Sequence, residues 1–284
     1  MTELLPGQYQ IGGITIGRHT NVVVENFDAK PYEVNAQDYQ LPRSDEIRFG
    51  FDHFKPTSVE IQMQVIYNYQ LPPFENIALP DFWINAVTVE DLASVWRGDS
   101  VRSQWGAMMP LYFCDRSGIT KIIYGRPGSF ASEKVSEKST LVKCVGEFRR
   151  ADTLTYDVEE ETISLTTGQS KLLTNNTNEY AWVRIVGSNG ASNPTLNFGG
   201  IHISVNLTLT TGQSFEISSY PWQRRAILSD GTNIRNLISN TAADDNILYL
   251  DQLYVPPQTS LTLSYTSGGG TMYVITQGAT TGVI

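Results

Sequence analysis

The sequence predicts a mainly β protein with two domains: an N-terminal β-sandwich that carries one short α-helix, and a C-terminal antiparallel β-sandwich. Three observations lead to this fold class. Short segments of alternating apolar and polar residues occur along the whole chain, one segment has the caps and spacing of a helix, and the composition changes near residue 160. The expected domains are therefore residues 1–160 and 161–284.

Alternating segments in the first half predict strands that are buried on one face. The clearest is 58–69, SVEIQMQVIYNY, in which every second residue from Val59 is apolar. Prolines at positions 72, 73 and 80 then predict a long loop, because proline cannot donate to a β-ladder. The other expected strands are 8–16 with a turn at Gly12-Gly13, 21–27, 32–41, 109–114, 121–124 and 141–148, with a hairpin joining 109–114 to 121–124.

A single short helix is expected after residue 88. Thr88 is a suitable N-cap, and Asp91 three residues later completes a weak capping box. Gly98 is expected to end the helix. Apolar residues at helical spacing share one face, namely Leu92, Val95 and Trp96.

The second half has few charges and many threonines. Charged residues fall from 37 in residues 1–160 to 12 in 161–284, while threonine rises from 9 to 18. This composition favours strands. The acidic run 157–161, DVEEE, is interpreted as a linker or as the solvated end of a strand. The expected strands are 182–186, one that opens with 193–196, 201–207, 214–217, 222–228, 249–254, 260–265 and 271–276.

Charge and cysteine content exclude several classes of protein. The 284-residue chain has a net charge of −9, the opposite of what a protein that grips DNA phosphates requires. We expect no secretory signal and no membrane insertion, because no apolar stretch approaches the length of a membrane span. Cys114 and Cys144 lie in apolar strands and are expected to be buried thiols, with a disulfide between them left open.

A search for catalytic chemistry finds no candidate residues. The histidines, His19, His53 and His202, are far apart and lack flanking ligand patterns, and no nucleophile, zinc or phosphate-loop motif occurs. The pair Asp244-Asp245 lies in a polar segment that is typical of a solvated loop. We therefore expect no catalytic, metal or cofactor site, and no enzyme activity.

Aromatic residues in the second half allow one alternative function. Trp182, Tyr220 and Trp222 could form a platform that stacks on sugar rings, as in a carbohydrate-binding module for host cell-wall glycans. Core packing is the competing interpretation, because large aromatic side chains dominate ordinary cores.

Several segments form a recognisable series along the chain, beginning with the run PRSDEIRFGFDHFKPTSVEIQMQV at 42–65 and continuing with 92–113 and 122–130. The series resembles siphophage distal tail (Dit) proteins, a family of phage minor tail proteins, in the version found in actinobacteriophages. Residues 42–65 resemble their strand–loop–strand, and the next two segments resemble the helix and hairpin that follow. DTLTYD at 152–157 resembles the end of their N-terminal domain, with Thr153 in place of a frequent proline. NPT at 193–195 and the segments 210–217 and 253–263 resemble their C-terminal sandwich, with Gln258 in place of a usual glycine.

The resemblance implies a role in the virion at the tail tip. Such proteins form a homo-hexameric ring from the N-terminal domain, between the tail tube protein and the tail hub, and DNA passes through the ring. The galectin-like C-terminal sandwich offers a docking platform for receptor-binding or other tip proteins. An acidic channel wall would let DNA pass without being gripped.

Within this role, two tryptophans and three arginines become candidate residues. Trp96 and Trp105 are expected to be packed in the core of the ring-forming domain. Arg97, Arg102 and Arg126 are candidates for salt bridges between domains or subunits, because the planar guanidinium matches carboxylates, although ordinary surface charges would give the same sequence.

Overall fold

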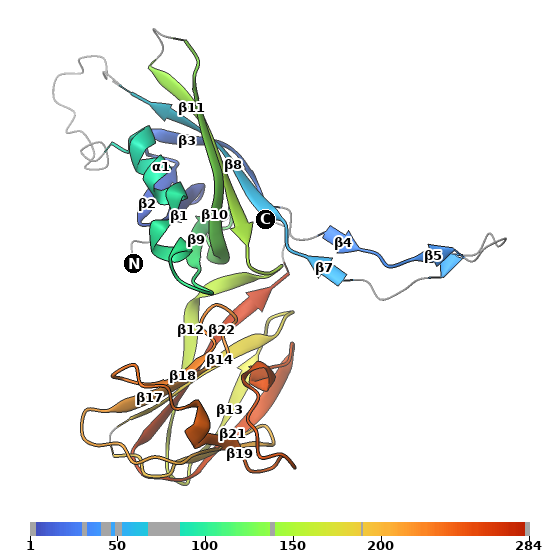
Figure 1. Cartoon of the computed structure of the whole chain (residues 1–284), viewed down its shortest axis with the longest axis vertical. Helices are drawn as coiled ribbons and strands as arrows, with labels where there is room; N and C mark the ends of the chain where they lie inside the picture. The colour runs from blue at the N-terminus through green and yellow to red at the C-terminus, as the bar shows by residue number, and fades with distance from the viewer. Residues whose placement is uncertain are drawn as a thin grey trace. The chain divides into compact units, whose positions relative to one another are not determined.

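The computed structural model describes residues 4–29, 33–40, 47–48, 53–67, 86–136, 140–188 and 190–281 (Figure 1). Two compact units divide the chain: the N-terminal unit runs to Thr155, and the C-terminal unit spans Tyr156–Thr280. Both units are built mainly from antiparallel strands, so the predicted fold class is confirmed. In the described residues no helix is long and apolar enough to cross a membrane.

The N-terminal unit is one curled antiparallel sheet around a hydrophobic core. Its strand order is β2-β1-β9-β10-β11-β8-β3, and the two ends of this order, β2 and β3, come into contact. The core holds the apolar face of the alternating segment that begins at Val59. The strands are β1 (Gln8–Ile11), β2 (Ile14–Gly17), β3 (Val22–Asp28), β8 (Ser58–Ile66), β9 (Met109–Cys114), β10 (Thr120–Lys134) and β11 (Leu141–Arg150).

The predicted helix forms as α1 (Val89–Arg97), with the predicted caps at both ends. Thr88 accepts a hydrogen bond from the Asp91 amide at 3.1 Å, and the Asp91 carboxylate accepts one from the Thr88 amide at 2.9 Å. Gly98 takes the left-handed conformation with φ 61° and ends the helix. The one-turn helix α2 (Asp99–Arg102) follows directly.

Trp96 fixes α1 on the sheet. Its side chain is 1% exposed and lies against the bare backbone of Gly146 in β11. The indole Nε1 donates to the Glu147 carbonyl at 3.0 Å, and the ring packs against Phe130 with centroids 5.5 Å apart. Trp96 is therefore a core residue, as expected from its spacing with Leu92.

The strands β3 and β8 are continued by two further ladders in nearly the same register. Asp28 lies opposite Glu60 in the β3–β8 ladder. Glu33 of β4 (Glu33–Asn35) lies opposite Lys55 of β7 (His53–Lys55). Glu33 follows Asp28 by five residues and Lys55 precedes Glu60 by five, so the register is the same. The short strands β5 (Tyr39–Gln40) and β6 (Ile47–Arg48) then pair with a shift of one residue. The described ladders follow one antiparallel hairpin pattern, whereas the sequence predicted a single strand over 32–41.

The C-terminal unit is a sandwich of two antiparallel sheets around its own core. One sheet has the order β18-β17-β14-β22-β12 with β20 beside β14, and the other has the order β13-β21-β15-β16-β19. The strands are β12 (Thr155–Thr166), β13 (Ser170–Asn175), β14 (Ala181–Ser188), β15 (Thr195–Phe198), β16 (Ile201–Val205), β17 (Ser214–Ser218), β18 (Arg225–Leu228), β19 (Ile238–Asn240), β20 (Tyr254–Val255), β21 (Thr259–Ser267) and β22 (Thr271–Thr280).

Two predictions for this half need correction. Of the two interpretations of the acidic run 157–161, the linker is wrong and the solvated strand is correct, since the run lies inside β12, where its glutamates are exposed. The segment 249–254 is not one strand, since half of it forms the short 3-10 helix η3 (Leu250–Gln252), and β20 begins only at Tyr254. The prolines at 72, 73 and 80 and the side chain of His53 lie outside the residues described.

Candidate functional site

Trp105 is the most exposed large apolar side chain of the described residues. Its exposed fraction is 103%, so the prediction that it packs in the core is wrong. The residue sits in the loop between α2 and β9, and Gly106 directly after it has φ 72°, a left-handed turn conformation that glycine adopts readily. A fully exposed indole is a candidate anchor for a partner, because tryptophan is enriched among the residues that dominate binding at protein interfaces.

Arg126 holds the loop of Trp105 from both sides. Its Nη2 donates to the carbonyl of Gln104 at 2.9 Å, and its Nε donates to the carbonyl of Ala107 at 2.5 Å. These two carbonyls flank Trp105 in the chain. A single guanidinium therefore fixes the loop that presents the indole, which lowers the entropy that docking would cost.

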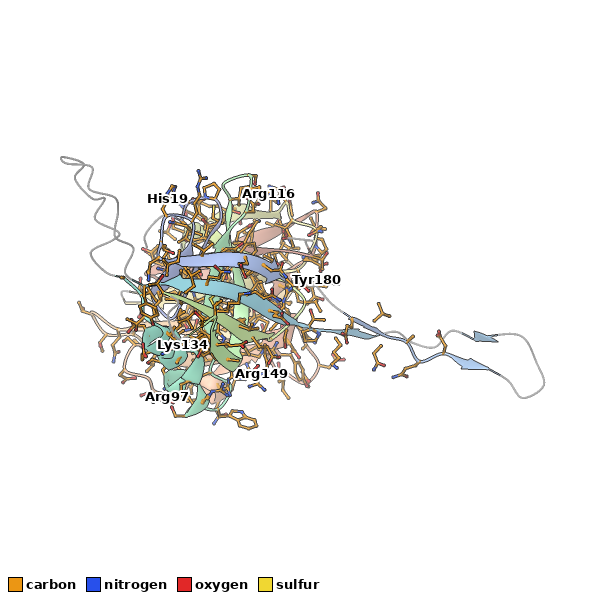
Figure 2. All side chains as sticks on the ribbon, turned by 90° about the horizontal axis from the view of Figure 1, so that it is seen from above. His19, Arg97, Arg116, Lys134, Arg149 and Tyr180 are labelled. Atoms are coloured by element: carbon orange, nitrogen blue, oxygen red, sulfur yellow. The ribbon has the colours of Figure 1, made fainter. Side chains whose placement is uncertain are left out.

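Arg102 and Arg97 also make contacts within the N-terminal unit. Arg102 donates to the carbonyls of Arg97 at 2.6 Å and Pro127 at 2.7 Å, which ties the end of α1 to β10. Arg97 pairs with Asp99 at 2.6 Å, and both side chains are exposed to solvent. Figure 2 labels Arg97 at the surface. Among the described residues, Arg102 and Arg126 bind main-chain carbonyls instead of carboxylates. The expected contacts of these arginines with another subunit stay a prediction.

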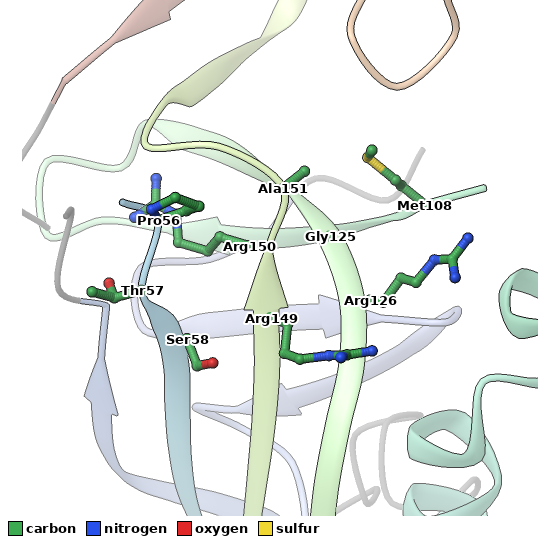
Figure 3. Close-up of a pocket in the computed structure, with 9 residues that line it drawn as sticks. All are labelled: Pro56, Thr57, Ser58, Met108, Gly125, Arg126, Arg149, Arg150 and Ala151. Atoms are coloured by element: carbon green, nitrogen blue, oxygen red, sulfur yellow. The ribbon is translucent and has the colours of Figure 1, made fainter. Parts of the chain in front are cut away.

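A pocket of about 380 Å³ opens beside this loop and is rich in arginine (Figure 3). Arg126 and Arg149 are direct cross-strand partners in the β10–β11 ladder, and Arg150 follows. Like charges placed opposite each other repel, so an anionic group in the pocket would relieve the repulsion. The full lining is Pro56, Thr57, Ser58, Met108, Gly125, Arg126, Arg149, Arg150 and Ala151.

Glu147 partly offsets the positive charge of this pocket, because its carboxylate is bound by Ser58 of the lining and interacts with the charge of Arg149. It accepts hydrogen bonds from the hydroxyls of Ser58 at 2.6 Å and Ser129 at 3.1 Å. The Ser58 bond above all, with Ser129 and the charge of Arg149 adding to it, lowers the pKa of Glu147 below its usual range.

The three aromatic residues of the alternative glycan platform do not form one surface. Tyr220 is 2% exposed, so it cannot stack on a ligand, and its part in the platform is wrong. Trp222 is half-buried and packs edge-on against Tyr156, with centroids 4.5 Å apart. Trp182 packs instead against Tyr254. Core packing accounts for these contacts.

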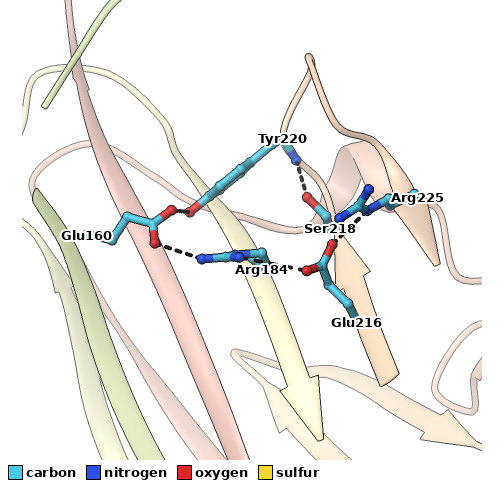
Figure 4. Close-up of polar contacts among 6 residues, drawn as sticks. All are labelled: Glu160, Arg184, Glu216, Ser218, Tyr220 and Arg225. Atoms are coloured by element: carbon cyan, nitrogen blue, oxygen red, sulfur yellow. Dashed lines mark hydrogen bonds and ion pairs between the residues drawn. The ribbon is translucent and has the colours of Figure 1, made fainter. Parts of the chain in front are cut away.

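A charged network covers the outer face of one sheet of the sandwich (Figure 4). Arg184 pairs with Glu160 at 2.7 Å and with Glu216 at 3.7 Å, and Glu216 pairs with Arg225 at 2.7 Å. The hydroxyl of Tyr220 donates to Glu160 at 3.3 Å. The network links β12, β14, β17 and β18, so it extends across the sheet, and its charges are matched within the unit.

The remaining chemical candidates are inert in this structure. Cys114 and Cys144 are both buried and free, and burial raises the pKa of the Cys144 thiol. In the described residues no group of histidine, cysteine, aspartate or glutamate side chains is arranged to hold a metal ion. The Asp244-Asp245 segment is exposed, as expected for a solvated loop.

Comparison with solved structures identifies the fold. The SPP1 Dit (gp 19.1) protein, described as a hub adsorption apparatus in phages that infect Gram-positive bacteria, superposes with a TM-score of 0.59 at 14% identity, over 96% of this chain and 98% of that chain. The chain has the Dit fold. Baseplate chains of phage P2 in the activated conformation, with Ca and with Sr, have the same fold, with TM-scores of 0.54 and 0.56 at 7% identity over 95% of this chain and 97% of those chains. No protein-family model and no curated protein matches the sequence.

Sequence reasoning missed the pocket beside Trp105 within this Dit fold. The signal was present: Arg149-Arg150 ends an alternating strand, and SQWGA at 103–107 places the tryptophan among polar and small residues. A tryptophan without apolar neighbours in the sequence is a poorer core candidate than Trp96, which lies on an apolar helix face.

Proposed function

We propose that this chain is a structural protein of a phage tail tip. In this role it forms a hexameric ring, joins the tail tube to the tail hub and supports other tip proteins at the end of a long non-contractile tail. The observation that carries the proposal is the fold similarity to the SPP1 Dit protein, which extends over both compact units. Fold similarity alone does not fix a function, so local features must agree with it.

The β4–β7 and β5–β6 ladders support assembly with a second subunit. Each is a two-stranded sheet, and among the described residues neither has a third strand. An isolated two-stranded ladder is marginally stable in water, and its free edges offer backbone donors and acceptors to another chain. We infer that the hairpin to which they belong lies on an adjacent subunit of the ring.

Trp105 and the arginine pocket supply a second surface for assembly. Trp105 is an exposed anchor on a loop that Arg126 fixes, and the same arginine lines the pocket. A partner with an apolar recess next to a carboxylate would match both features, because tryptophan and arginine contribute most to protein interfaces. The contact is with the adjacent subunit, the tail tube protein or the tail hub.

The net charge of −9 supports a conduit for DNA. An electronegative wall repels phosphates and prevents adhesion during genome ejection. A ring whose channel is lined mainly by lysine and arginine would contradict this part of the proposal.

The experiment that tests assembly is size-exclusion chromatography with light scattering. The chain is measured alone and after mixing with the purified tail tube and tail hub proteins of the same phage. We expect a species of six 31.6 kDa subunits, alone or on addition of one partner. A 31.6 kDa monomer under all three conditions, with neither partner co-eluting, would refute the ring.

Two matched variants separate the docking surface from general surface effects. Trp105→Ala removes the exposed anchor, and Ile119→Ala removes an exposed apolar side chain from the β9–β10 turn of the same unit. The first is expected to weaken assembly and the second to leave it unchanged. If both variants assemble equally well, Trp105 is not part of the interface, and the proposal of a ring is unaffected.

A further inference from the structure

Positive charge is scarce in the C-terminal unit and is concentrated at one place. Residues 156–280 contain 5 lysines and arginines against 10 aspartates and glutamates. Three of these five cations, Arg224, Arg225 and Arg235, line a single pocket of about 460 Å³. An acidic unit that gathers most of its cations around one cavity has a local potential suited to an anionic ligand.

The pocket is built on a fixed main chain. Ile227 of β18 forms a β-bridge with Asn233, and the Ile234 amide donates to the Ala226 carbonyl at 3.0 Å. The Asn233 side chain accepts from the Arg235 amide at 2.8 Å, and Arg235 is the first residue of the short 3-10 helix η2 (Arg235–Leu237). The position of Arg235 at the pocket wall is thus set before any ligand arrives.

Arg235 has donor capacity that the described residues do not use. Its Nη2 donates to the carbonyl of Leu248, whereas its Nη1 is buried and has no hydrogen-bond partner in the described part of the chain. Burial lowers the pKa of Arg235, and the charge of Asp251 opposes that shift. A buried guanidinium nitrogen without an acceptor is unfavourable, and a small rotation of the Arg235 guanidinium toward the pocket would bring Nη1 to a carboxylate or phosphate oxygen.

The other two arginines differ in what they can contribute. Arg225 is already engaged by Glu216 at 2.7 Å, so it forms a wall of the pocket and contributes little free donor capacity. Arg224 is exposed, and none of the described residues forms an ion pair with it. Arg224 and Arg235 are therefore the two groups that can meet an anion.

Tyr249 adds a planar face to the charged pocket. Its side chain is 43% exposed, and its hydroxyl donates to Asp245 at 3.0 Å, which holds the ring in place. An exposed and oriented aromatic ring beside arginines offers an apolar contact for the face of a sugar ring. Asn233 and Asp251 in the same lining supply polar groups for hydroxyls.

We propose that this pocket binds an anionic saccharide, a sugar unit that carries a carboxylate or a phosphate. Arg235 and Arg224 bind the anion, Tyr249 packs on the sugar face, and Asp251 accepts from hydroxyls. This site is distinct from the Trp182, Tyr220 and Trp222 platform expected from the sequence. Binding by an isolated chain does not require ring formation, so it can succeed or fail independently of the tail-tip role.

Isothermal titration calorimetry on the full chain tests the site with four probes: glucuronate, glucose 6-phosphate, glucose and inorganic phosphate. We expect saturable binding of glucuronate or glucose 6-phosphate that weakens with added salt, and no binding of glucose. Comparison of the two anionic sugars shows whether the pocket prefers a sugar that carries a carboxylate or one that carries a phosphate. Absence of binding by both would overturn the proposal, as would equal affinity for inorganic phosphate, which would indicate a bare anion site.

Three variants connect the binding to this pocket. Arg224→Gln and Tyr249→Ala alter exposed side chains that the fold does not need, and each should weaken binding at least about tenfold, the effect of one lost charged or stacking contact. Lys171→Gln removes the same charge from an exposed position outside the pocket lining and should change nothing. An equal loss of affinity in Lys171→Gln would show that binding depends only on the net charge of the protein, and would overturn the assignment of this site.

Discussion

The contact between Trp96 and Gly146 makes a sharp prediction for the N-terminal unit. A Cβ atom added to Gly146 would lie 2.7 Å from Nε1 of Trp96 and closer still to Cε2 and Cζ2. Carbon atoms in contact sit at roughly 3.5–4.0 Å, so the indole would have to shift by about 1 Å. It has little room to do so, because it is buried, bonded to the Glu147 carbonyl and packed on Phe130.

The expected cost of Gly146→Ala follows from this geometry. Overpacking of a close-packed core costs about 1–3 kcal/mol, and weakening the indole hydrogen bond adds about 1 kcal/mol. We therefore expect a loss of roughly 2–4 kcal/mol in the free energy of unfolding of the N-terminal unit. Trp96→Ala alone should cost about 3–5 kcal/mol, because a large buried side chain leaves a cavity.

A double-mutant cycle isolates the contact itself. In the Trp96→Ala background the space over Gly146 is empty, so Gly146→Ala should cost close to nothing. Urea unfolding followed by far-ultraviolet circular dichroism measures all four forms, with Val145→Ala, an exposed neighbour in β11, as the control expected within about 0.5 kcal/mol of wild type. The reasoning is refuted if Gly146→Ala leaves the unfolding midpoint unchanged, or if it costs the same with and without Trp96.

Three further predictions concern exposure, thiol chemistry and pH. Trp105→Ala should change the free energy of unfolding by less than about 0.5 kcal/mol and should remove the emission that acrylamide quenches most readily; a large loss of stability would mean that Trp105 is packed after all. Cys114 and Cys144 should resist iodoacetamide in the native protein and react in denaturant, so mass spectrometry that finds rapid native labelling would contradict their burial. Glu147 has a lowered pKa in the folded protein, so the stability it contributes should be complete above its unfolded pKa near 4.5 and lost as pH falls through the lower folded value. Unfolding curves taken at successive pH values should show this acid-induced loss of stability, and Glu147→Gln should reduce it. A loss of the same size in Glu147→Gln would argue against the Ser58 bond.

Local signals allowed the helix and the hairpin that follows it to be predicted well. The capping box of Thr88 and Asp91 and the stop at Gly98 need only residues adjacent in sequence, and each forms as expected. The β9–β10 hairpin likewise follows from alternation on both sides of a short polar turn. Such features depend on backbone geometry more than on what the tertiary structure places nearby.

Features that depend on distant neighbours were not predictable in the same way. Trp96 and Trp105 are nine positions apart, yet one is buried and the other fully exposed, because only the first faces the sheet. The acidic run 157–161 was compatible with a linker, but a solvent-facing strand with exposed acidic side chains has the same sequence pattern, and the run lies in β12. The pockets require Arg126 to meet Arg149, and Arg224 to meet Arg235, across elements whose pairing the sequence does not state.

The register that the β3–β8 ladder shares with the β4–β7 and β5–β6 ladders could not be predicted from the sequence either. The sequence between Tyr32 and Leu41 alternates well enough to suggest one strand, whereas β4 and β5 are separate short strands with separate partners. Short two-stranded ladders gain little from local propensity and depend on what they pack against. This dependence is the reason that we assign the hairpin to a contact between subunits.

Cryo-electron microscopy of the assembled tail tip tests the central claim most directly. The proposal predicts six copies of this chain in a closed ring between tail tube and tail hub, with the hairpin of each copy on its neighbour and Trp105 buried at a protein contact. A tail tip whose ring is built from another protein, with this chain absent or attached only as a peripheral monomer, would contradict it.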